Sequence, residues 1–247
     1  MRFVRTLHPF EPSGLDLLQR RGIAIRGRAP QRCRHAQYGF EIMSERLRHT
    51  IGFAGTADSQ QARCRALRFW EFTGADTYHL PSRQIAAAKN LGMVENARLF
   101  ALVSLATADG FIAIFDAKYA YNFWRPVTAI RNGDIDGNDA TERDAAWEPF
   151  ISTPMHPEYP CAHCISEASA AAVLSAIFGD AIPTVSMTTP TAPGVTRSFS
   201  RLSDIVTEVI NARIYDGVHY RTSGEVGADM GRKIGEYVMQ NFLRPLR

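Results

Sequence analysis

Hydrophobic residues recur along much of this chain at the three- to four-residue spacing of an α-helix. The clearest example is the segment 94–107. Its predicted apolar face consists of Val94, Ala97, Phe100, Ala101 and Leu105. Asp109-Gly110 predicts a dent or a break, after which the helical pattern resumes over 111–124. It stops at Arg125-Pro126, because a residue before proline avoids the α region.

Further segments have helical patterns with recognisable ends. Ser82 is a predicted N-cap, and Gly179 is a predicted C-terminal glycine. The remaining predicted helices are 62–72, 83–91, 162–178, 202–214 and 223–243. Polar or proline-rich loops are predicted over 74–82, 132–144, 149–160 and 183–198. Strand signals are scarce, so the expected fold class is all-α, a helix bundle with long functional loops.

The N-terminal segment 1–57 differs from the rest of the chain. Its first fifty residues hold ten arginines, no lysine and four acids, in a chain whose net charge is +3. Proline and glycine divide it into short pieces, so we expect a poorly specified basic arm before one catalytic helical domain over 58–247. Because the positive charge is confined to this arm, the composition argues against a nucleic-acid partner.

Composition also bears on location. The sequence has no secretory hydrophobic region near Met1. The most apolar stretch, 99–115, is interrupted by Asp109 and Gly110, so no membrane span is expected. The four cysteines do not form the pattern of a secreted disulfide scaffold; they are Cys33, Cys64, Cys161 and Cys164. We therefore expect a soluble, cytoplasmic protein with reduced thiols.

Two cations lie among aromatic residues near the end of the 111–124 segment. Lys118 and Arg125 are two helical turns apart, so their side chains face the same way if the helix continues. A solvated basic face is the ordinary interpretation of such a pair. Their bulky neighbours favour an anionic partner instead, because a cation removed from water needs one. These neighbours are Tyr119, Tyr121, Phe123 and Trp124.

A histidine lies at the predicted start of helix 162–178, in the run Pro160-Cys161-Ala162-His163. Backbone N–H groups at a helix N-terminus favour an oxyanion, as does the helix dipole. His163, in the first turn, can then exchange protons with the bound group. A histidine that merely lies near a helix start is the alternative, and for this run alone it is the better interpretation.

Arg213 and His219 form the third candidate group. Six residues of unbroken helix would turn their side chains apart, but Asp216-Gly217 offers a break that lets them converge. Arg213 could then bind two oxygens of an anion, and His219 could act as a nucleophile or as a metal ligand. A helix cap with a surface histidine is an equally good interpretation of this pair in isolation.

Taken together, the three groups resemble the superfamily of type 2 phosphatidic acid phosphatases and vanadium-dependent haloperoxidases. That family has the motifs K-x6-R-P, P-S-G-H and S-R-x5-H-x3-D. This chain has the same spacings in the runs from Lys118 to Pro126, from Pro160 to His163 and from Ala212 to Ser223. The run Asn122-Phe123-Trp124-Arg125-Pro126 is similar to the soluble, haloperoxidase-type branch. The resemblance covers roughly residues 65–247.

The resemblance implies an anion site. Lys118, Arg125 and Arg213 would bind the oxygens of vanadate or phosphate, together with the helix start at Cys161 and Ala162. His163 would be the acid–base residue. His219 would bind vanadium, or would accept a phosphoryl group in a phosphatase. The implied reaction oxidises a halide with hydrogen peroxide, with Lys118 hydrogen-bonding the peroxide.

Three positions depart from the family motifs. Cys161 replaces serine and Ala162 replaces glycine, although the backbone N–H groups remain. Ser223 replaces the aspartate that orients the second histidine in the family, so His219 should be a weaker nucleophile or ligand. Glu225 and Asp216 are the sequence candidates to replace that carboxylate. Soluble members of the family also carry another helical region before the catalytic one, so self-association of this chain is expected.

A different class of function rests on Cys161-Ala162-His163-Cys164. A C-x-x-C run at a helix N-terminus is typical of a reactive thiol pair. A thioredoxin-like fold requires a strand just before it, and the proline-rich 149–160 segment does not predict one. Zinc would need two further ligands, which Cys33 and Cys64 are not arranged to supply.

Two alternatives remain within the family. One is a phosphomonoesterase that acts on a phosphate ester through phospho-His219. The other is a degenerate member that binds the anion without turnover, which the residues at Cys161 and Ser223 motivate. The preferred prediction is a vanadate-dependent haloperoxidase-like enzyme whose partners are the small molecules peroxide and halide.

Overall fold

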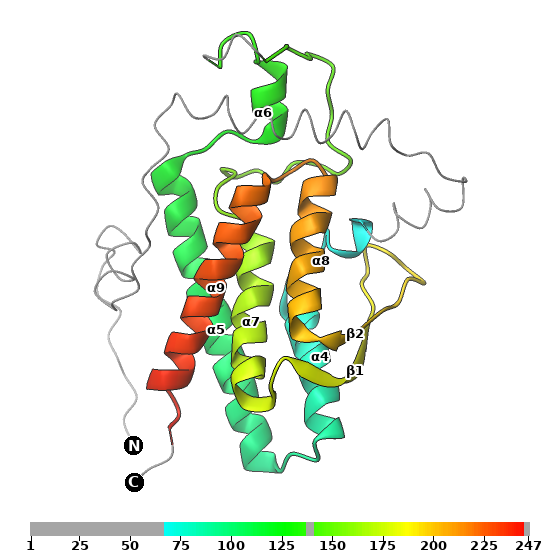
Figure 1. The fold of residues 1–247 in the computed structure, drawn as a ribbon, viewed down its shortest axis with the longest axis vertical. Helices are drawn as coiled ribbons and strands as arrows, with labels where there is room; N and C mark the ends of the chain where they lie inside the picture. Colours follow the sequence, from blue (N-terminus) through cyan, green and yellow to red (C-terminus); the bar gives the residue numbers. More distant parts are fainter. Residues whose placement is uncertain (1–66, 137–140, 245–247) are drawn as a thin grey trace.

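The computed structural model describes residues 67–136 and 141–244, and these form a helix bundle with one small hairpin (Figure 1). The helices are α4 (Ala75–Ala88), α5 (Met93–Tyr121), α6 (Pro126–Arg131), α7 (Ala162–Phe178), α8 (Leu202–Tyr215) and α9 (Arg221–Asn241). The strands are β1 (Ala181–Met187) and β2 (Arg197–Arg201). The mostly helical fold class is confirmed. The basic arm predicted over 1–57 lies outside the described residues.

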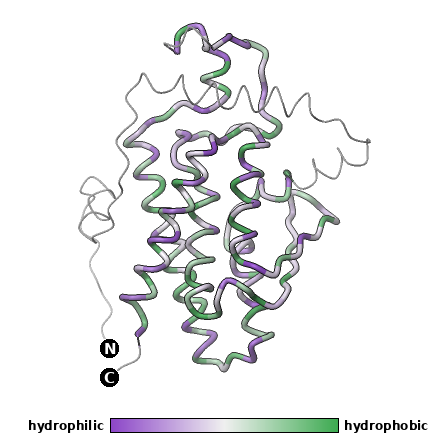
Figure 2. The backbone as a smooth tube through the Cα atoms, viewed as in Figure 1, coloured by the Kyte–Doolittle hydropathy of each residue, from purple (hydrophilic) through white to green (hydrophobic). Residues whose placement is uncertain are grey.

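Helix α7 is the centre of the bundle and packs against α5, α8 and α9. Its bounds are those that the sequence predicts, and Gly179 ends it with a φ of 85°. The helix is rich in alanine, serine and other small or apolar residues, and most of its side chains are buried. Figure 2 shows hydrophobic positions spread along all the helices, so each contributes part of its surface to a shared core.

Helices α7 and α9 approach each other closely because glycines of α9 face α7. A Cβ at Gly227 would lie 2.6 Å from the carbonyl oxygen of Cys161. At Gly231 it would lie 2.5 Å from the carbonyl oxygen of Ile165. No side chain fits at such distances, so these positions require glycine for packing rather than for backbone freedom.

Helix α5 is continuous through Asp109-Gly110, so a break, one of the two alternatives predicted there, is wrong. Gly110 is buried against α7, where an added Cβ would lie 3.0 Å from Ser169 Oγ. The glycine therefore serves close helix packing. The continuous helix ends at Tyr121, with Asn122 in a left-handed conformation, rather than at Trp124.

The apolar face predicted for 94–107 is also wrong. Val94 is 80% exposed and Leu105 is 38% exposed. The buried face of α5 is offset from the predicted one and consists of Leu99, Leu102, Val103, Ala106, Thr107, Gly110, Ala113, Ile114, Ala117 and Lys118. Because α5 is apolar on both sides, periodicity alone could not identify the side that packs.

The loop predicted over 74–82 is helical. Helix α4 begins at Ala75 and contains Pro81 in its interior, so Ser82 is not an N-cap. Its hydroxyl instead donates to the Tyr78 carbonyl at 2.6 Å. The buried side chains of α4 follow helical spacing; they are Thr77, Pro81, Ser82, Ile85 and Ala86. Tertiary packing of this face outweighs the proline penalty that the sequence suggests.

The hairpin of β1 and β2 includes the loop predicted over 183–198 and extends beyond it at both ends. Strands β1 and β2 pair antiparallel, with Val185 opposite Phe199, and both side chains are buried. Gln84 of α4 holds β1 through two hydrogen bonds with the backbone of Ser186, at 2.7 and 2.8 Å. The hairpin thus covers one side of the bundle, and its polar sequence had suggested a loop.

The segment Met93–Arg131 is long and apolar enough to cross a membrane by length and composition, with a mean hydropathy of 1.7 over an 18-residue window. The sequence-based expectation had treated its centre as too short and too polar. One such helix is weak evidence of a span, because the core helix of a soluble protein passes the same test. Helix α5 here packs against α7 and α9.

A single added methyl group tests the α7–α9 packing. We expect Gly231→Ala to destabilise the protein by about 1–3 kcal/mol, because its Cβ would meet the Ile165 backbone. At a helix position with free space around it, the same change stabilises a protein by about 1 kcal/mol. The sign of the change in unfolding free energy therefore tests whether Gly231 is packed against α7. Urea unfolding measures the effect, and Glu225→Ala, at an exposed position of α9, is the control. An unfolding midpoint above that of the parent would contradict this packing.

One buried carboxyl in the core makes stability depend on pH. Glu167 of α7 is buried and accepts a hydrogen bond from the Thr77 hydroxyl at 2.5 Å. Burial raises the pKa of Glu167 to about 7, although the Thr77 bond opposes that shift. The protonated carboxyl therefore favours folding below pH 4.5, and this contribution is lost as pH rises through about 7.

Glu167→Gln removes this titration. Relative to the parent, we expect the variant to gain up to about 3 kcal/mol of unfolding free energy between pH 4.5 and pH 8, because glutamine never ionises. Urea unfolding of both proteins at the two pH values gives this difference, in which the other titrating groups cancel. If the unfolding free energies of the variant and the parent differ by the same amount at both pH values, Glu167 is ionised or solvated in the fold.

Candidate active site

The candidate site lies at the end of the bundle where four elements meet (Figure 1). These are the last turn of α5, the first turn of α7, the end of α8 and the turn that leads into α9. Lys118 of α5 is fully buried, and its Nζ donates to the carbonyl oxygens of Pro157 at 3.0 Å and Glu158 at 2.8 Å. Burial and the charge of Arg125 lower the pKa of Lys118 to about 8, although Glu158 opposes the shift.

Arg125 reaches the same place by a different route from the one expected. The helix does not continue between Lys118 and Arg125; Arg125 is the extended residue before α6. Its guanidinium donates to the carbonyl oxygens of His156 at 3.0 Å and Val218 at 2.7 Å. The two cations therefore converge because the chain turns, not because they share a helix face. Burial lowers the pKa of Arg125 to about 10.

Arg213 is the third buried cation, 1% exposed at the end of α8. Its NH1 donates to the carbonyl oxygen of Trp70 at 3.2 Å and to Asp216 Oδ2 at 3.1 Å. Its Nε and Asp216 Oδ1 are both buried without a hydrogen-bond partner. A buried, unpaired guanidinium N–H is costly unless a further acceptor binds there.

The predicted break at Asp216-Gly217 is confirmed. Helix α8 ends at Tyr215, and Gly217 has a φ of 75°. A side chain there would be strained, and its Cβ would also lie 3.1 Å from the Trp147 ring. The turn brings His219 back towards Arg125, whose NH1 lies 3.2 Å from His219 Nε2.

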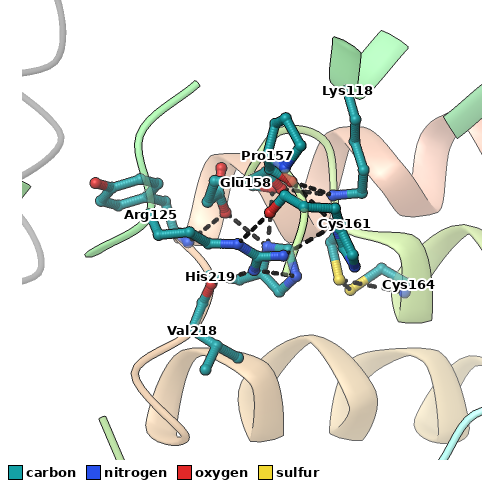
Figure 3. A network of polar contacts seen from close by, with 11 residues as sticks. Lys118, Arg125, Pro157, Glu158, Cys161, Cys164, Val218 and His219 are labelled. Carbon is teal, nitrogen blue, oxygen red and sulfur yellow. Dashed lines mark hydrogen bonds and ion pairs between the residues drawn. The ribbon is translucent and has the colours of Figure 1, made fainter. Parts of the chain in front are cut away.

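Glu158 is a site residue that sequence reasoning missed. Its Oε1 lies 2.6 Å from His219 Nδ1 and also accepts the N–H of Tyr220 at 3.1 Å (Figure 3). The carboxyl is fully buried. Burial raises the pKa of Glu158 to about 7, against the charges of Lys118 and Arg125 and the Tyr220 hydrogen bond. Only its position next to the proline-rich motif, two residues before Pro160, could have drawn attention to it.

The contact with Glu158 determines which nitrogen of the His219 ring carries the proton. Burial and the nearby charges of Arg125 and Lys118 lower the pKa of His219 well below its usual value, so the ring is neutral. A neutral imidazole has one N–H, and the Glu158 carboxylate takes it at Nδ1. Nε2 therefore carries a lone pair, and it faces the Arg125 guanidinium.

The residues expected to replace the family aspartate do not do so. Asp216 pairs with Arg213, and Glu225 is exposed on α9. Ser223 itself lies 3.4 Å from His219 Nδ1, a longer contact than that of Glu158. The carboxylate that orients His219 thus comes from a loop 61 residues earlier in the chain.

The Pro160-Cys161-Ala162-His163 run opens α7, as predicted. Cys161 is the N-cap, and its own backbone N–H donates to the Ser223 carbonyl at 3.1 Å. That N–H is therefore engaged within the protein. His163 is partly exposed, and its Nε2 lies 3.1 Å from the Glu71 carbonyl oxygen. Burial and the charge of Arg213 lower the pKa of His163 well below its usual value.

His156 is a second residue that the sequence did not point to. Its Nδ1 lies 3.1 Å from Arg125 NH2, and its ring packs edge-on against Phe115. Burial and the charge of Lys118 lower the pKa of His156 to about 4, so its ring is neutral. The side chain is only half-buried, so it borders the site on the solvent side.

Comparison with known proteins identifies the family of this arrangement. Residues 98–247 match the family model described as the VCPO second helical-bundle domain. This match covers more than half of the chain, so the chain belongs to the vanadium haloperoxidase superfamily. A search of curated proteins finds no match.

Solved structures give the same family. A bacterial vanadium-dependent iodoperoxidase is 27% identical to this chain with a TM-score of 0.65, and the match covers 84% of this chain and 48% of that one. A holo-type bacterial vanadium-dependent chloroperoxidase is 18% identical with a TM-score of 0.60, covering 83% and 47%. At that lower identity the likeness shows the fold alone. The chain spans about half the length of these relatives.

The residues present fit an oxyanion such as vanadate. Three buried cations face two buried carboxyls, and burial raises the pKa of each carboxyl to about 7. The cluster therefore has excess positive charge, which an anion would offset. The unpaired Nε of Arg213 is a suitable donor to its oxygens, and the lone pair on His219 Nε2, which faces Arg125, is a suitable ligand for its central atom. Among residues 67–136 and 141–244, no three His, Cys, Asp or Glu side chains form a metal-ion cluster.

Glu158→Gln tests whether the carboxylate controls His219. We expect orthovanadate to bind about 10–100-fold more weakly to this variant, because an amide can stabilise the wrong tautomer of the ring. Isothermal titration with orthovanadate measures the affinity. Glu225→Gln makes the same chemical change at an exposed carboxyl of α9, so it is the matched control and should leave the affinity unchanged. A larger loss in Ser223→Ala than in Glu158→Gln would assign the orienting role to the serine.

Proposed function

We propose that this chain carries the catalytic site of a vanadate-dependent haloperoxidase, which oxidises a halide with hydrogen peroxide. The observation that carries the proposal is the neutral His219 ring. Glu158 contacts its Nδ1, Arg125 contacts its Nε2, and the charges of the buried Lys118 and Arg213 also act on the ring. One histidine near three buried cations suits a ligand such as vanadate, whose negative charge lies mainly on its oxygen atoms.

Each residue has a role in this proposal. His219 Nε2 would hold bound vanadate, and Glu158 would fix the ring and increase its basicity. Arg125 and Arg213 bind oxygens of the anion, the latter through its unpaired Nε. Lys118 uses two of its three N–H groups on carbonyls, so one remains for the anion or the peroxide. Bound vanadate supplies a Lewis acid that polarises peroxide towards attack by halide.

His163 is the proposed acid–base residue. Its lowered pKa keeps the ring neutral near pH 7 but weakly basic, so a proton that it takes from peroxide would be returned readily to an oxygen that leaves. Its position in the first turn of α7 places it beside Cys161 and Ala162. The Cys161 N–H already donates to the Ser223 carbonyl, so it is not available to a bound anion. The N-terminus of α7 would therefore favour the anion through the helix dipole.

Iodide is the first halide to consider. The relative with 27% identity is an iodoperoxidase, and iodide is also the halide that loses electrons most readily. Since the chain spans half of its relatives' length, the activity of a whole haloperoxidase is part of the proposal.

A phosphomonoesterase is the second candidate. The same neutral His219 would attack phosphorus with its Nε2 lone pair once Arg125 NH1 turns from that nitrogen to the phosphate, and the three cations would bind the phosphate oxygens. A third outcome is anion binding without turnover. The engagement of the Lys118 and Arg125 donors with backbone carbonyls favours it, because an anion must compete for some of these donors.

Halide oxidation by the purified protein tests the proposal. We expect hydrogen peroxide with iodide or bromide to halogenate a dye only after orthovanadate is added. His219→Ala should abolish this rate, because it removes the proposed vanadium ligand. His79→Ala is the matched control, since this histidine lies on α4 and contacts Ser104.

The other outcomes separate the alternatives. Hydrolysis of a phosphate ester without halide oxidation, lost in His219→Ala, would establish the phosphatase. Tight binding of orthovanadate with neither reaction would establish the degenerate member. Full activity in His219→Ala, with an unchanged unfolding midpoint, would overturn the site assignment.

A further inference from the structure

Two cysteines lie together in the first turn of α7, next to the candidate site. Cys161 and Cys164 are free thiols, both fully buried. Their sulfur atoms are 2.6 Å apart (Figure 3). The oxidation of a halide requires neither sulfur, and the family motif has a serine at the first of these positions. The pair is therefore a feature of this chain that the proposed function does not explain.

The contacts between the two cysteines are directional. Cys161 is the N-cap of α7, and its sulfur accepts the backbone N–H of Cys164 at 3.3 Å. The Cys164 thiol donates to the same sulfur. Cys161 thus has the surroundings of a thiolate, with two donors and the positive end of a helix dipole.

The positive charges of the site help to separate the pKa values of the two thiols. Burial raises the pKa of Cys161, but the Cys164 thiol, Arg213, the Cys164 N–H and Lys118 together lower it to about 7. Burial and the hydrogen bond to Cys161 raise the pKa of Cys164 well above its usual value. One sulfur is therefore suited to attack an electrophile, and the other retains its proton.

We propose that Cys161 and Cys164 form a dithiol that a hydroperoxide oxidises to a disulfide, with Cys161 attacking and Cys164 completing the bond. The Cys161 sulfur attacks one peroxide oxygen and breaks the O–O bond, which leaves a sulfenic acid and hydroxide. The Cys164 sulfur then attacks the Cys161 sulfur and expels hydroxide. Protons from both thiols convert the two hydroxides to water, so two thiols and one peroxide give one disulfide and two waters.

The positions of the sulfurs favour this product over further oxidation. A disulfide has an S–S length of about 2.05 Å, so the two sulfurs need move little from their 2.6 Å separation. The sulfenic acid would form with its reaction partner already in contact. Both thiols are fully buried, so a small hydroperoxide is the class of oxidant that the proposal requires.

The experiment omits vanadate and halide, so it is independent of the proposed function. The reduced protein is treated with hydrogen peroxide, then denatured with N-ethylmaleimide, and the peptide containing both cysteines is analysed by mass spectrometry. We expect an unalkylated peptide two hydrogens lighter than the dithiol, and dithiothreitol should restore double alkylation. Cys33→Ser/Cys64→Ser serves as the background and removes the other two thiols. Full alkylation of both cysteines after peroxide would overturn the proposal.

Single variants test the two roles. In Cys164→Ser, Cys161 should still react with peroxide and accumulate as a sulfenic acid that dimedone labels. In Cys161→Ser, the reaction of Cys164 should be at least tenfold slower. Equal rates in the two variants, with unfolding midpoints equal to that of the parent, would contradict the assignment of Cys161 as the attacking sulfur.

Discussion

Burial of three cations at one end of the bundle is the electrostatic constraint on which the rest of the site depends. Lys118, Arg125 and Arg213 are each at most 6% exposed. Two buried carboxyls partly offset their charge, and backbone carbonyls from the loops before α7 and α9 supply much of the remaining solvation. This requirement explains why the long loops are ordered against the bundle, since their carbonyl oxygens replace water around the cations.

The helix packing and the site share contacts. The Cys161 carbonyl meets Gly227 of α9, and the Cys161 N–H donates to Ser223 in the first turn of the same helix. His219 lies just before that turn. The close α7–α9 approach therefore fixes the distance between the start of α7 and the His219 ring. A change that separates the two helices would move the two histidines relative to each other, even if it lay far from the site.

The sequence allowed some of this to be predicted, for identifiable reasons. The bounds of α7 followed from a small-residue run between Pro160 and Gly179, and the convergence of Arg213 and His219 followed from the Asp216-Gly217 break. The hairpin and the buried face of α5 could not be predicted, because polar strands and a helix apolar on both sides give weak or ambiguous periodicity. Glu158 escaped detection because its partner lies 61 residues away and nothing local specifies that contact.

The replacement of the family aspartate illustrates a general limit of motif reasoning. A motif records residues at fixed spacing, whereas His219 requires only an acceptor within hydrogen-bond distance of Nδ1. Glu158 meets that need from another element, and its carbonyl group also binds Lys118. One residue thus orients the histidine through its side chain and positions a cation through its backbone. Ser223 is then not needed to orient His219, and its carbonyl instead accepts the Cys161 N–H at the N-terminus of α7. The departure at Ser223 is therefore compensated within the site, and it does not by itself indicate loss of function.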